Sequence, residues 1–101
     1  FIQDTSSITT NGAGTTVNLS SAVATKFTMT VDRTAGATNV VEIDLQCSIS
    51  DSAYIQIATI TDLTNEPVLA SIGNVACNYM RYNVVTVGAG NTLTISLIAS
   101  R

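Results

Sequence analysis

Residues 40–50 alternate strictly between apolar and polar side chains, and this pattern constrains the fold more than any other. The apolar positions are Val41, Ile43, Leu45, Cys47 and Ile49. The polar positions are Glu42, Asp44, Gln46, Ser48 and Ser50. A period of two indicates a β-strand with one buried face and one exposed face. Because a shift of one residue would bury two carboxylates, the facing of this strand is strongly specified.

Two further segments repeat the alternation. Residues 25–32 direct Phe27, Met29 and Val31 inward, and residues 91–100 direct Leu93, Ile95, Leu97 and Ala99 inward. Shorter strands are predicted at residues 15–19, with Val17 and Leu19 inward, and at residues 54–61 and 68–72, whose facing stays open. The turn-forming segment VGAGN at residues 87–91 predicts a β-hairpin between the strands beside it.

The sequence therefore predicts an all-β fold, an antiparallel β-sandwich of the Ig-like or jelly-roll-like type with about seven or eight short strands. A chain of 101 residues has the size of one domain, which we assign to residues 17–101. Residues 1–16 are small and polar, and we interpret them as a flexible N-terminal arm or an edge strand. In the first case Phe1 and Ile2 would anchor the arm against a neighbouring subunit.

Composition excludes several classes of function. The net charge is -3 and the chain has only four basic residues, which are scattered along it. Binding to nucleic acid or to an anionic membrane surface needs clustered basic residues, so neither partner is expected. No apolar run approaches the roughly 20 residues of a membrane-spanning helix.

The sequence offers no catalytic site and no site for a cofactor. There is no histidine, which removes imidazole bases and the nucleophile pairs that need them. Glu42 and Asp44 share a strand face, but we interpret them as a solvated acidic face and not as a glycosidase pair. The loop from Asp62 to Glu66 lacks the ligand count of a calcium site, so no metal is expected. We thus predict a protein that is not an enzyme and has no small-molecule substrate.

The two cysteines, Cys47 and Cys77, allow a single disulfide. A bridge between the two sheets of a sandwich is one possibility. Small secreted scaffolds are usually richer in cysteine, however, and free cysteines pack well as small apolar side chains. The sequence therefore favours two buried thiols.

The segment NYMRYNVV at residues 78–85 holds two of the three tyrosines of the chain and an arginine. If Met80, Tyr82 and Val84 face the core, then Tyr79, Arg81 and Asn83 face outward; the opposite facing would bury Arg81 at a large energetic cost. These last three residues, with Phe1 and Ile2, are our candidate interface, because Tyr and Arg are enriched at protein contacts. The alternative is that Tyr79 and Arg81 only cover the sheet and stack on each other.

A strand of the form Tyr-x-Arg-Tyr-x-x-Val, then a Gly-containing turn and the segment TLTISLIAS, resembles the small β-sandwich domains of virion structural proteins of tailed phages. The resemblance covers residues 78–100 well and residues 26–61 loosely. The chain departs from it in the middle, where DSAYIQIATITD stands and no Trp occurs.

The resemblance implies a capsid decoration (cement) protein on the outer capsid surface of the virion. Its partners would be the major capsid protein, identical subunits, or both. Two alternatives remain open. One is a carbohydrate- or receptor-binding module of a tail fibre or secreted protein. The other is an extracellular subunit of a pilus or surface layer, in which Cys47 and Cys77 would be bonded.

Overall fold

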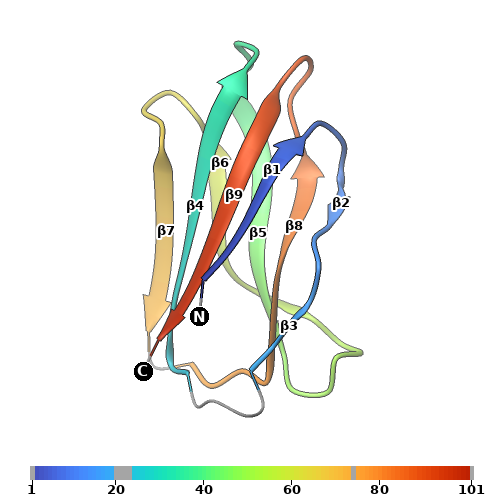
Figure 1. Cartoon of the computed structure of the whole chain (residues 1–101), viewed down its shortest axis with the longest axis vertical. Helices are drawn as coiled ribbons and strands as arrows, with labels where there is room; N and C mark the ends of the chain where they lie inside the picture. Colours follow the sequence, from blue (N-terminus) through green and yellow to red (C-terminus); the bar gives the residue numbers. More distant parts are fainter. Residues whose placement is uncertain (1, 20–23, 74, 101) are drawn as a thin grey trace.

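The computed structural model describes residues 2–19, 24–73 and 75–100, and this part of the chain forms two antiparallel sheets and no helix (Figure 1). One sheet has the order β1-β9-β4-β7, with strands β1 (Ile2–Ile8), β9 (Thr92–Ser100), β4 (Lys26–Ala35) and β7 (Val68–Gly73). The other has the order β2-β8-β5-β6, with strands β2 (Gly12–Ala13), β8 (Tyr79–Thr86), β5 (Val40–Ser48) and β6 (Ile55–Asp62); β3 (Val17–Asn18) also pairs with β8. The predicted all-β sandwich is confirmed.

The pairing of the strands is nested. Strand β5 pairs with β6, β4 with β7, β2 and β3 with β8, and β1 with β9, and every pair is antiparallel. The chain is thus one long hairpin whose successive pairs lie alternately in the two sheets. With β2 and β3 counted as one interrupted strand, this is the arrangement of a jelly roll, and the topology decides between the two predicted types.

The core lies between the two sheets, and the alternating residues supply it. Phe27, Met29 and Val31 of β4 are buried, as are Leu93, Ile95, Leu97 and Ala99 of β9, Ile43 and Leu45 of β5, and Val17 and Leu19 around β3. One expected core residue, Ile49, is 74% exposed, so its predicted facing is wrong. The reason is that β5 ends at Ser48, whose hydroxyl accepts hydrogen bonds from the amides of Ser50 and Asp51 and turns the chain away.

The hairpin predicted at residues 87–91 is also wrong. Strands β8 and β9 lie in different sheets, so this segment crosses from one sheet to the other. The crossing is held by the side chain of Asn91, which is only 2% exposed and hydrogen-bonds to both backbone groups of Thr38 and to the carbonyl of Val87. The connection between β4 and β5 crosses at the same place, and we call residues 36–39 and 87–91 together the Asn91 corner.

The two flanks of the sandwich differ. On one flank, Ile2–Ile8 forms β1, an edge strand paired with β9 with an irregular register between Thr5 and Ile8. Phe1 lies outside the described residues. On the other flank, β6 and β7 are the last strands of their sheets, and the turn that joins them contains a cis peptide bond between Glu66 and Pro67. Of the residues whose facing was open, Ile60 of β6 is buried while Ala70 and Ile72 of β7 are half-buried.

Candidate functional site

The outer face of β8 carries the polar residues that the sequence singled out. Met80, Tyr82 and Val84 are buried in the core, as predicted, and Tyr79, Arg81 and Asn83 are half-buried on the opposite face. This face continues across the sheet, because Arg81 lies opposite Gln46 of β5 and Asn83 lies opposite Asp44. Residues with amide, guanidinium and carboxylate groups therefore gather on the outside of β8 and β5.

Arg81 is held in place by two contacts. Its guanidinium carbon lies 3.8 Å from the centroid of the Tyr54 ring, and its Nε donates a hydrogen bond of 2.8 Å to Oε1 of Gln46. The alternative interpretation paired Arg81 with Tyr79, but the ring over which Arg81 lies belongs to Tyr54, in the loop before β6. These two contacts fix the Arg81 side chain against the outer face of the sheet.

Tyr54 connects this face to two other segments. Its hydroxyl donates a hydrogen bond to the carboxylate of Asp51 and lies 3.2 Å from the hydroxyl of Thr16. Thr16 precedes β3, and Asp51 has a positive φ of 64° in the turn after β5. The sequence analysis missed Tyr54 because nothing local links it to Arg81; the cluster forms only when the sheet brings these segments together.

The pKa of Tyr54 is raised, chiefly by desolvation of the phenol and next by the hydrogen bond to Asp51. A raised pKa means that the folded state binds the phenol proton more tightly than the unfolded state does. Its contribution to stability is therefore present below the ordinary pKa of about 10 and is lost as the pH rises through the folded pKa. We expect the free energy of unfolding of the wild type to fall above about pH 10.

Urea denaturation at a series of alkaline pH values measures this loss. The variant Tyr54→Phe should lose less stability over the same range, since it has no phenol proton there. Equal pH dependence of the wild type and Tyr54→Phe would contradict the assignment.

The paired carboxylates of β5 do not form the solvated acidic face that we predicted. Glu42 is exposed, but Asp44 is 6% exposed, and its Oδ1 accepts a hydrogen bond of 2.9 Å from the hydroxyl of Thr59. The correction follows from the position of β5 as an inner strand, since Asp44 lies between Asn83 of β8 and Thr59 of β6. Asp44 is therefore a polar residue enclosed by neighbours.

The carboxylates between β6 and β7 are also used within the fold. Asp62 accepts hydrogen bonds from the hydroxyl and the amide of Thr64, which lower its pKa in that order of importance. Glu66 forms an ion pair of 3.4 Å with Arg33 and accepts a hydrogen bond from its amide. Within the described ranges, no three His, Cys, Asp or Glu residues gather as metal ligands would, and no helix is long and apolar enough to span a membrane.

The two parts of the predicted interface lie in different sheets. Ile2 is 68% exposed on β1 and pairs with Ile98 of β9, which is 38% exposed. The neighbours of Ile98 in β9, Leu97 and Ala99, are buried, so Ile98 faces outward. The exposed isoleucines thus belong to one sheet and Tyr79, Arg81 and Asn83 to the other.

Cys47 and Cys77 form a disulfide, so the predicted pair of free thiols is wrong. Cys47 lies near the end of β5, and Cys77 lies just before β8, the strand that pairs with β5. Their Cα atoms are 5.7 Å apart, within the usual range for a disulfide. The spacing of the two cysteines in the sequence does not show that β5 and β8 lie side by side.

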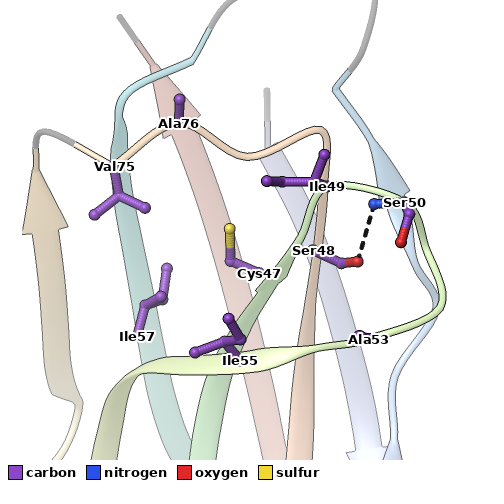
Figure 2. Close-up of a pocket in the computed structure, with 9 residues that line it drawn as sticks. All are labelled: Cys47, Ser48, Ile49, Ser50, Ala53, Ile55, Ile57, Val75 and Ala76. Atoms are coloured by element: carbon purple, nitrogen blue, oxygen red, sulfur yellow. Dashed lines mark hydrogen bonds between the residues drawn. The ribbon is translucent and has the colours of Figure 1, made fainter.

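An apolar cavity opens beside the disulfide. Figure 2 shows Ile55 and Ile57 of β6, Val75 and Cys47 around it, with Ile49 at one side. Its volume is about 440 Å³, within the range of small-ligand sites. The sequence analysis did not find it; the available signal was the uncharged, isoleucine-rich run over residues 53–61.

Comparison with known proteins supports the fold. No protein-family model matches the chain, and no curated protein matches it. The crystal structure of the SPBc2 prophage-derived protein YomS is similar to this structure, with a TM-score of 0.61 over 99% of this chain and 94% of that chain. The sequence identity is 9%, so the likeness shows a shared fold.

Proposed function

We propose that this protein is a structural protein of a phage virion, most specifically a decoration protein on the outer capsid surface. The observation that carries the proposal is the likeness, over almost the full length of both chains, to a protein derived from a prophage. The resemblance of residues 78–100 to phage sandwich domains points the same way. Jelly rolls are also a common architecture of viral capsid proteins.

The partners that we propose are the major capsid protein, identical subunits, or both. A protein that bridges two neighbours needs two separate contact surfaces. The face with Tyr79, Arg81 and Asn83 would provide one, and the exposed Ile2 on the other sheet would provide the second. The ordered guanidinium of Arg81 supports the first surface, because buried Arg and Tyr residues often dominate the energy of protein contacts.

Co-sedimentation of the purified protein with capsids of the phage that encodes it tests the proposal. We expect a fixed high copy number per capsid. The double variant Tyr79→Ala, Arg81→Ala should bind at least about tenfold more weakly and should keep the circular dichroism spectrum of the wild type, since both side chains lie on the outer face.

The matched control is Leu69→Ala with Ser71→Ala, which removes one large side chain and one hydroxyl from exposed positions of β7, at the opposite edge of the other sheet from β1. This pair should bind like the wild type. A protein that stays in the supernatant would contradict the proposed function, and equal weakening in both double variants would contradict the assignment of the face.

The disulfide agrees with a second candidate, a subunit of an extracellular assembly such as a pilus or surface layer, for which Cys47 and Cys77 were expected to be bonded. Disulfides persist on virions and cell surfaces and are rare in the cytosol. Both candidates meet this condition, so the location of the protein distinguishes them. Immunogold labelling of producing cells would mark released particles in the first case and the cell surface in the second.

A further inference from the structure

The flank formed by β6 and β7 is the least covered part of the apolar core. Eight half-buried apolar residues pack against the core of the described chain, and six of them lie on β6, on β7 or just after β7. These six are Ile57, Ala58, Val68, Ala70, Ile72 and Val75. The two sheets therefore leave an apolar strip along this side of the sandwich.

Strand β6 is also an edge strand with little protection by charge. It is an end strand of its sheet, and none of its residues from Ile55 to Thr61 is charged, although its last residue is Asp62 and its register with β5 shifts at two places. Natural edge strands are commonly protected by charges, bulges or very short length. The other edge of this sheet has such protection, because β2 and β3 contain only two residues each. A long uncharged edge offers backbone donors and acceptors to another strand.

The apolar cavity lies at the beginning of this edge. Ile49 and Ile55 at the cavity are 74% and 70% exposed, which is unusual for such large apolar side chains lying together. The polar side chains in its wall are already bonded: the hydroxyl of Ser48 accepts from two amides, and that of Ser50 bonds to that of Ser52. The cavity therefore fits apolar side chains that need no hydrogen bonds.

We propose that this surface binds the same surface of a second copy of the chain. We call it the β6 patch: Ile49, Ile55, Ile57 and Val75, with the free edge of β6. Because the patch carries no charge, two copies can meet there without like charges in contact, despite the net charge of -3. A two-fold axis brings a surface against itself, and antiparallel pairing of the two β6 edges supplies the backbone partners that each lacks.

This inference deepens the proposed function, since contacts between copies would join decoration subunits on a capsid. It concerns the protein alone, however, so its test needs no capsid. Failure of capsid binding would leave the self-association intact, and a monomeric protein would leave capsid binding intact. The two proposals can therefore be contradicted separately.

Sedimentation equilibrium of the purified protein over a concentration series tests the contact. A small patch of this kind should give a monomer–dimer equilibrium with a dissociation constant on the order of 10–100 μM. Ile55→Lys should raise this constant by at least about tenfold, because it places two ammonium groups in the contact. Ile49→Lys, at the other side of the cavity, should raise the dissociation constant by a similar factor. This second variant keeps the test valid if Ile55→Lys fails to fold.

Leu69→Lys is the matched control. Leu69 is 61% exposed on β7 but does not line the cavity, so this variant should associate like the wild type. Amide hydrogen exchange at high and low protein concentration should show added protection in residues 55–61. A wild type that stays monomeric at about 1 mM, an unchanged constant in both lysine variants, or protection that appears elsewhere would overturn the proposal.

Discussion

Replacement of Asn91 by alanine should lower the free energy of unfolding by about 3 kcal/mol. Its side chain is 2% exposed, its Oδ1 accepts from the amide of Thr38 at 3.2 Å, and its Nδ2 donates to the carbonyls of Thr38 at 2.8 Å and Val87 at 3.0 Å. Alanine would leave these backbone groups without partners, and each such group costs about 1–3 kcal/mol when it is buried. Urea denaturation followed by circular dichroism measures the loss.

The control for this variant is Asn11→Ala, which removes a hydrogen bond to the same loop from an exposed side chain. The side-chain oxygen of Asn11 accepts a hydrogen bond of 2.9 Å from the amide of Val87, but Asn11 is exposed, so water can replace it. We expect a loss below about 1 kcal/mol for this variant. Comparable losses at Asn11 and Asn91 would show that the Asn91 corner does not hold the crossing.

The facing of the long strands could be predicted from the sequence because it depends on local alternation alone. Leu93, Ile95 and Leu97 are buried wherever their strand sits, since one face of any strand in a sandwich meets the core. The same reasoning placed Met80 and Tyr82 inward and Arg81 outward. The prediction failed at Ile49 because alternation does not show where a strand ends.

The assignment of strands to sheets could not be predicted in this way. A short Gly-containing segment between two alternating runs has the same local pattern whether it closes a hairpin or crosses between sheets. Here the crossing between the sheets depends on hydrogen bonds between Asn91 and Thr38, which are far apart in sequence and meet only in the folded chain. The positive φ of 98° at Gly36 belongs to the same corner, where a β-carbon would collide with Asn91.

Only part of the candidate face could be predicted, again because some of its contacts join segments that are far apart in the sequence. Alternation placed Tyr79, Arg81 and Asn83 on one side of β8, but the partner of Arg81 comes from another segment. Tyr54 reaches it because the loop before β6 returns beside β5 and β8. The apolar cavity likewise needs Val75, in the connection between β7 and β8, to lie near Ile55 of β6. Contacts of this kind depend on the order of the strands in the sheets, which local alternation in the sequence does not show.

Reduction of the disulfide should have an effect as large as the loss of Asn91. The bond joins residues 30 positions apart, and a closed loop of that size restricts the unfolded chain enough to contribute about 3.5 kcal/mol to stability. The double variant Cys47→Ala, Cys77→Ala should lose at least this amount, since it also removes two sulfur atoms that are buried in the core.

Thermal unfolding of the oxidised wild type, the reduced wild type and the double variant separates the crosslink from the packing of sulfur. The reduced wild type should unfold well below the oxidised form, because only the crosslink has been removed. A reductant should leave the double variant unchanged, which controls for its effects on the solvent. The segment before β8 carries both Cys77 and Val75 of the β6 patch, so reduction should also weaken self-association. Identical unfolding of the oxidised and reduced wild type would show that the bond does not stabilise the fold.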